Sequence, residues 1–142
     1  MIKKPSNQEY LEYDGGHCSG IWKELDEIWK CPSCKRTKRE VMMWVKRKSL
    51  GGHNDGWSSP LTRHHDHSDL KRFKCTIICG LCNSADGNAK VKCGLPADFS
   101  FSPEEIGLFV TPVPNAKHSR IYFEKAKSIY DSIQNIKFSD QS

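Results

Sequence analysis

The chain has 142 residues, so one domain is expected and two independent domains are disfavoured, because a single core normally serves about 100 to 200 residues. Only 37% of the residues are apolar and 27% are charged, which predicts a thin core that needs a non-hydrophobic cross-link. The formal charge of +5 suits a polyanionic partner. No apolar run is long enough to span a bilayer or to mark a secretion signal near Met1, so we expect a cytoplasmic protein, with an oxidised secreted protein as the disfavoured alternative.

The N-terminal half of the chain predicts few regular elements. The first 17 residues are polar and show no periodicity, which predicts an irregular arm. Apolar residues at helical spacing predict a short amphipathic helix over residues 19–29. Residues 41–48 are β-branched and aromatic and favour a strand, whereas the turn residues of 50–60 predict a loop.

The C-terminal half predicts a hairpin followed by helices. Residues 61–65 and 74–78 can pair as two short strands, and a helix should begin near residue 82 and end by residue 94. Ser102 is a helix cap followed by a proline and two glutamates, which is favourable chemistry for a helix start. A final amphipathic helix is expected over residues 119–136, with an apolar face that is either core or a dimer contact.

Seven cysteines without a secretion signal indicate metal ligands rather than disulfides. Two CxxC motifs, Cys31–Cys34 and Cys79–Cys82, can each place two sulfurs at adjacent corners of a tetrahedron. Four thiolates close the coordination shell of a soft or borderline ion, which predicts a structural Zn²⁺ site. The remaining cysteines are expected to be small buried apolar side chains: Cys18, Cys75 and Cys93. A weaker alternative is a second metal site made by His17, Cys18 and Cys93.

Residues 64–67 read His-His-Asp-His, a dense group of metal-ligating side chains. On an extended segment His64 and Asp66 share one face, while His65 lies on the other. Asn83 follows the last cysteine of the second motif, so the zinc site should hold it beside the hairpin. We therefore expect a cation site made by His64 and Asn83, with Asp66 as a further candidate ligand and His65 unliganded within reach of a water molecule.

These segments resemble a known nuclease family. The strings LTRHHDHS over residues 61–68 and KCTIICGLCNS over residues 74–84 resemble the HNH endonucleases, also called ββα-metal or His-Me finger nucleases. The chain is most similar to the phage recombination endonuclease VII group, in which two CxxC motifs flank a histidine-containing hairpin and an asparagine follows the last cysteine. The resemblance covers residues 31–92. It implies an α+β fold: a small zinc-stapled ββα-metal nuclease domain with flanking helices.

The resemblance also implies the role of each site residue. His65 would be the general base, and His64 and Asn83 would bind the catalytic divalent cation. The endonuclease VII group usually has aspartate where His64 stands, and histidine at this position is similar to other HNH branches such as bacterial toxin nucleases. Since a histidine makes the site softer, Mn²⁺, Ni²⁺ and Zn²⁺ join Mg²⁺ as candidate cations, and Asp66 can supply a carboxylate.

The expected organisation is an N-terminal arm and helix in residues 1–30, a zinc-bound HNH nuclease core in residues 31–94 and a C-terminal helical extension in residues 95–142. DNA is the expected partner, and basic residues around the hairpin are expected to hold its phosphates: Arg63, Lys71, Arg72 and Lys74. Symmetric cleavage of both strands needs two sites, which favours a homodimer.

Several functions are compatible with this pattern. The short chain with its basic, glycine-rich insertion favours a sequence-specific endonuclease of restriction type, of bacterial or phage origin. A structure-specific enzyme for branched DNA and a phage nicking endonuclease are alternatives, because family chemistry does not define the substrate. The non-enzymatic alternative is a zinc-ribbon DNA-binding module, and a cysteine-based redox protein is disfavoured by the lack of a βαβ pattern.

Overall fold

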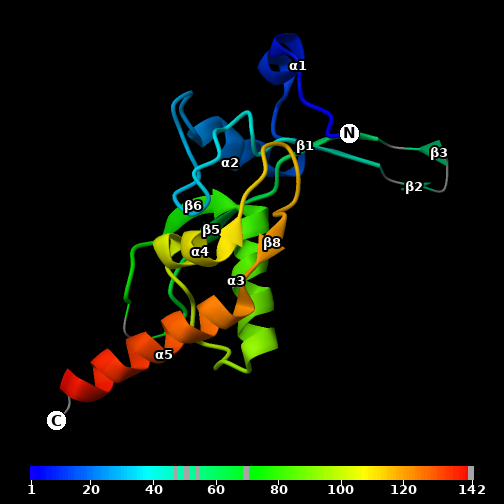
Figure 1. The fold of residues 1–142 in the computed structure, drawn as a ribbon. Coiled ribbons are helices and arrows are strands. Elements are labelled where there is room, and N and C mark those ends of the chain that lie inside the picture. The colour runs from blue at the N-terminus through cyan, green and yellow to red at the C-terminus, as the bar shows by residue number, and fades with distance from the viewer. Residues whose placement is uncertain (47, 50–51, 54, 69–70, 141–142) are drawn as a thin grey trace.

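The computed structural model describes residues 1–46, 48–49, 52–53, 55–68 and 71–140 (Figure 1). The helical elements are α1 (Asn7–Glu12), a 3₁₀ turn (Gly16–Cys18), α2 (Ser19–Glu24), α3 (Gly80–Cys93), α4 (Pro103–Phe109) and α5 (Phe123–Asp140). The strands are β1 (Met43–Val45), β2 (Lys48–Ser49), β3 (Gly52–His53), β4 (Gly56–Ser58), β5 (Leu61–His64), β6 (Thr76–Cys79), β7 (Val110–Thr111) and β8 (Arg120–Ile121). The chain is thus a small fold of mixed helices and strands.

The centre of the fold is a hairpin that leads directly into a helix. Strands β5 and β6 are antiparallel, with Leu61 opposite Cys79 and His64 opposite Thr76. Helix α3 follows β6 without a linker and ends at Gly94, which adopts the left-handed conformation that favours glycine. The predicted hairpin and the helix after it are confirmed, and the helix begins two residues earlier than expected.

The N-terminal segment is more regular than predicted. Helix α1 lies in the segment expected to be irregular, and a capping box stabilises its start: the Ser6 hydroxyl accepts from the Glu9 amide, and the Glu9 carboxylate accepts from the Ser6 amide. The Ser-x-x-Glu pattern in the sequence is the signal that could have found it. Helix α2 is shorter than predicted and ends at Glu24, because Leu25 is extended.

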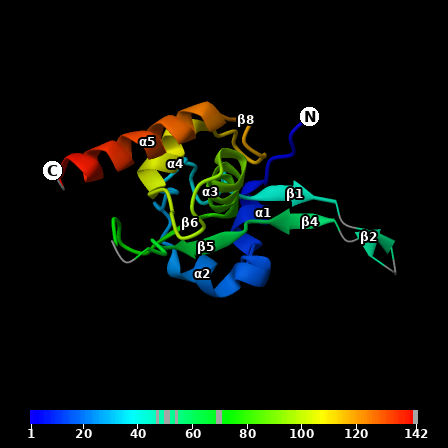
Figure 2. The same cartoon turned by 90° about the horizontal axis from the view of Figure 1, so that it is seen from below.

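A two-stranded ribbon occupies part of the segment expected to be a loop over residues 50–60, of which residues 50, 51 and 54 lie outside the described residues. Strand β1 pairs with β4, and strand β2 pairs with β3. The strand expected over residues 41–48 is confirmed in part, because β1 covers residues 43–45 of it. Trp44 and Trp57 lie opposite each other with ring centroids 5.2 Å apart, which stabilises the pairing of β1 and β4. The ribbon extends away from the rest of the molecule (Figure 2).

The C-terminal helices cover the hairpin-helix unit. Ser102 caps α4 through a capping box, as its sequence predicted. Helix α5 begins four residues later than expected, because Arg120 and Ile121 form strand β8, which pairs with β7. Helix α5 packs against α3 and α4 with Ala126 fully buried, so its apolar face belongs to the core (Figure 1).

One cluster of buried side chains draws on all parts of the chain. It includes Trp22 from α2, Ile78 from β6, Phe101, Phe109 at the end of α4 and Ala126 from α5. The expected N-terminal, central and C-terminal segments therefore share a core. None of the helices among the described residues combines the length and the apolar character that a bilayer crossing requires.

Gly107 makes α4 fit closely against the first CxxC motif, and this contact can be tested. A Cβ atom at Gly107 would overlap the carbonyl oxygen of Ser33, which lies between the two cysteines of that motif. We expect Gly107→Ala to lower the free energy of unfolding by roughly 1–3 kcal/mol, as other overpacking changes do. Gly87→Ala in α3 is the matched control, because nothing lies within 4 Å of its added Cβ atom. That variant should instead be stabilised by roughly 0.5–1 kcal/mol in urea unfolding. Equal stability of the two variants would contradict the close fit.

Candidate functional site

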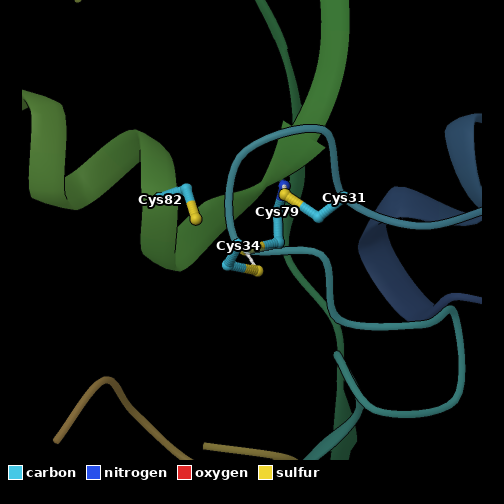
Figure 3. Close-up of side chains that lie close together, drawn as sticks. All are labelled: Cys31, Cys34, Cys79 and Cys82. Carbon is cyan, nitrogen blue, oxygen red and sulfur yellow. Dashed lines mark hydrogen bonds between the residues drawn. The ribbon is translucent and has the colours of Figure 1, made fainter. Parts of the chain in front are cut away.

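Four buried cysteines converge at the junction of β6 and α3 (Figure 3). Cys31 and Cys34 lie on a tight turn, in which the Lys35 amide donates to the Cys31 carbonyl over 2.8 Å. Cys79 ends β6 and Cys82 lies in the first turn of α3. The four sulfurs lie within 4.8 Å of one another, and within the described ranges no other three histidine, cysteine or acidic side chains gather in this way. The quartet could hold a structural metal such as zinc, as its spacing predicted.

Arg36 places a positive charge against the sulfurs. Its Nε atom donates to the Cys34 sulfur over 3.1 Å and its Nη2 atom to the Cys79 sulfur over 3.5 Å. The side chain is 3% exposed, and its Nη1 atom donates to the carbonyl oxygens of Val113 and Ala116. A buried charge is costly without a partner, and the sulfurs of Cys34 and Cys79 provide one by accepting hydrogen bonds from this guanidinium. Arg36 thus faces the cysteines rather than solvent.

The close packing of the four thiols raises the pKa of two of them and lowers the pKa of the other two. Hydrogen bonds with neighbouring thiols, above all with Cys31, raise the pKa of Cys79 and Cys82. Hydrogen bonds with the other thiols, with Arg36 contributing, lower the pKa of Cys34. The pKa of Cys31 falls to about 7, because bonds with Cys79 and Cys82 outweigh the opposing bond with Cys34. A divalent cation could replace the protons that the crowded thiols retain, which is how thiolate zinc sites form.

His118 is a neighbour of the quartet that its sequence position did not reveal. It lies in the loop between β7 and β8, and its Nε2 atom is 3.7 Å from the Cys82 sulfur. Its buried Nδ1 atom has no hydrogen-bond partner in the described part of the chain. Burial lowers the pKa of His118, and the charge of Arg36 lowers it further. These observations fit a neutral ring with the hydrogen on Nε2, donating to the Cys82 sulfur.

The other three cysteines do not form a second metal site. The Cys18 thiol donates to the Leu61 carbonyl over 3.6 Å, and the Cys93 thiol to the Phe123 carbonyl over 3.4 Å. The site considered for His17, Cys18 and Cys93 is therefore wrong, because none of these side chains belongs to a ligand cluster among the residues described. The expected burial is wrong as well: Cys18 and Cys93 are half-buried and Cys75 is exposed.

His64 is the last residue of β5, and Asn83 lies in the first turn of α3. His64 is 4% exposed, its ring stacks on Phe73 at a centroid distance of 5.1 Å, and its Nε2 atom is 2.6 Å from the Phe101 carbonyl oxygen. If Nε2 donates to this oxygen, Nδ1 keeps a lone pair, which is the usual state of a metal-bound histidine. Asn83 is exposed on the first turn of α3.

Asp66 organises the loop between β5 and β6. One carboxylate oxygen accepts from the Ser68 amide and hydroxyl at 3.0 and 2.8 Å, and the other accepts from the Arg72 amide at 2.8 Å. Burial raises the pKa of Asp66, but these hydrogen bonds outweigh burial and keep the pKa below its ordinary value. Both oxygens of this candidate ligand are thus engaged within its own loop.

The candidate phosphate-binding residues differ in their pairing. Arg72 forms a two-point ion pair with Glu105 at 3.0 and 3.1 Å and donates to the Ser100 carbonyl, which fastens the loop to α4. Arg63 pairs with Glu24 on α2. The two lysines are exposed and form no ion pair with any residue that the structure describes: Lys71 and Lys74.

His65 opens onto a cavity of about 470 Å³. Its exposed ring lies 4.3 Å from the ring of His67, measured between centroids. The cavity lining also includes Asp66 and the basic residues of the loop: Lys71, Arg72 and Lys74. The structure therefore gathers His65 with the candidate phosphate-binding residues of the loop, whereas His64 and Asn83 are not part of this lining.

The quartet can be tested by removing one sulfur. We expect Cys79→Ser to lose bound zinc and to unfold at a lower temperature, because it disconnects the hairpin from the first CxxC motif. The zinc content, measured by mass spectrometry, and the temperature of thermal unfolding should fall together. Cys75→Ser is the control, since Cys75 is exposed and outside the quartet, and it should keep both values. Full zinc content and unchanged thermal stability in Cys79→Ser would rule out the metal centre.

Comparison with known proteins assigns no family to the chain. No protein-family model matches it, and no curated protein or solved structure matches it either. The similarity to HNH endonucleases therefore rests on the motifs of residues 61–68 and 74–84. The structure itself establishes a small fold of mixed helices and strands with four buried cysteines that could hold a zinc ion.

Proposed function

We propose that this protein is a metal-dependent HNH-type endonuclease that hydrolyses phosphodiester bonds in DNA. The observation that carries the proposal is the β5–β6 hairpin running directly into α3, with the cysteine quartet at the junction. His64 ends the first strand and Asn83 lies in the first turn of the helix, which is the order of ββα-metal nucleases. The exposed ring of His65 beside a basic cavity supports the same chemistry.

In the proposed reaction His65 acts as general base. Its solvent-exposed imidazole takes a proton from the water that attacks the scissile phosphorus. His64 and Asn83 would hold the divalent cation, which when bound stabilises negative charge on the phosphate and the leaving oxygen. The hydrogen bond from Nε2 to the Phe101 carbonyl orients the His64 ring, so Nδ1 would be the atom left to bind the cation.

Substrate positioning falls mainly to two lysines. Lys71 and Lys74 are exposed on the cavity and have no ion pair among the described residues, so they can contact phosphates of the cut strand. Arg72 contributes indirectly, because its pairing with Glu105 holds the loop that carries both lysines. A restriction-type enzyme that acts as a homodimer remains our preferred form, and branched-DNA or nicking enzymes are the alternatives with the same site.

A zinc-ribbon DNA-binding module is the second candidate. It is favoured by the hydrogen bonds of His64 and Asp66, both of which serve the fold. Incubation with plasmid DNA and Mn²⁺ or Mg²⁺, with and without a chelator, separates the two functions. Cation-dependent cleavage supports the nuclease, and DNA binding without cleavage under every cation tested supports the binding module.

Substitution of His65 tests the assigned base. His65→Ala should keep its fold and zinc content, because the side chain is exposed, but plasmid cleavage should fall by about 10²- to 10⁴-fold. His17→Ala is the matched control, since His17 is an exposed histidine outside the cavity, and it should cleave at the wild-type rate. A fully active His65→Ala protein would remove His65 from the mechanism.

A further inference from the structure

A second basic groove lies at the base of the β1–β4 ribbon, away from the His65 cavity. It has a volume of about 360 Å³ and is lined by the N-terminal segment, by β1 and by the loop between β7 and β8. Three exposed lysines line the groove: Lys3 in the N-terminal segment, Lys46 directly after β1 and Lys117 in the loop between β7 and β8. The lining contains no acidic side chain, and it shares no residue with the His65 cavity.

Hydrogen bonds hold the three segments together. The Arg39 guanidinium donates to the Pro5 carbonyl at 2.7 Å, which fastens the N-terminal segment. The Asn115 side-chain amide donates to the carbonyl oxygens of Arg39 and Met42 at 3.0 and 2.8 Å, which fastens the loop that carries Lys117. Asn115 is 8% exposed and adopts a left-handed φ of 61°, so it holds this loop in a defined conformation. The convergence of the lysines is therefore set by the fold.

The charges of the groove are not neutralised locally. The Lys3 ammonium lies 3.4 Å from the centroid of the Trp44 ring, a cation–π contact that leaves its charge intact. None of the three lysines forms an ion pair within the described ranges. The Glu9 carboxylate lies outside the groove lining and offsets part of the Lys3 charge, while it also accepts from the Ser6 amide and the Trp57 indole. With three lysines and no acidic side chain in its lining, the groove carries a net positive charge.

We infer that this groove binds the phosphate backbone of double-stranded DNA as a second contact, separate from the cleavage site. The choice of DNA rests on the proposed function, whereas the anionic chemistry rests on the groove itself. Lysines act as point charges for phosphate rather than as readers of base edges, so the contact is independent of sequence. The adjoining ribbon extends from the same edge of the fold, so bound DNA would run along it (Figures 1 and 2).

The test compares two triple substitutions with the same change in net charge. One variant carries Lys3→Gln, Lys46→Gln and Lys117→Gln. The control carries Lys23→Gln, Lys92→Gln and Lys125→Gln, which are exposed lysines outside the groove. Fluorescence anisotropy with a labelled duplex, at several salt concentrations and with no added divalent cation, measures binding without cleavage. Circular dichroism and zinc content verify that both variants are folded.

We expect the groove variant to bind the duplex more weakly and to lower the salt slope of log K by roughly 2.7, because each phosphate contact contributes about 0.9. The control variant should keep a slope near that of the wild type. Equal slopes for the two variants would overturn the inference. So would a loss of affinity in the groove variant that is measured with labelled single-stranded RNA but not with the duplex. The proposed nuclease fails separately, if the wild-type protein binds the duplex but does not cut it with any divalent cation.

Discussion

The packing of four sulfurs around one point is the constraint on which the rest of the structure depends. The sulfurs come from a tight turn, from the end of β6 and from the start of α3, and they lie within 4.8 Å of one another. Four thiolates this close would repel one another unless positive charge compensates them. Arg36 supplies part of this charge, and a zinc ion is suited to supply the remainder.

This centre determines where the hairpin and α3 meet, and a second network determines the shape of the histidine loop. Asp66 gathers the loop through three hydrogen bonds, and Arg72 attaches it to Glu105 on α4. Between these supports His64 is buried while its neighbour His65 reaches solvent. Two imidazoles of this loop are exposed, those of His65 and His67, and the general-base role proposed for His65 needs an imidazole that water can reach.

The basic residues of the chain serve different physical purposes. Arg36 faces sulfurs, and Lys38 is 7% exposed with its ammonium 4.6 Å from the Trp22 ring, so both are parts of the core. Arg72 holds a loop in place. The His65 cavity and the groove at the base of the β1–β4 ribbon are two places where exposed lysines from the described residues lie together. Net charge alone could not separate these groups.

The sequence by itself determined the elements whose signals are local: the two CxxC motifs, the β5–β6 hairpin, the helix after it and the Ser102 cap. The capping box at Ser6 was an equally local signal for α1, although a polar composition obscured it. Only the tertiary structure decided that Arg36 and His118 flank the sulfurs, that the oxygens of Asp66 are engaged, and that three distant lysines share a groove. These features depend on contacts between residues far apart in the chain, whose partners no short sequence pattern encodes.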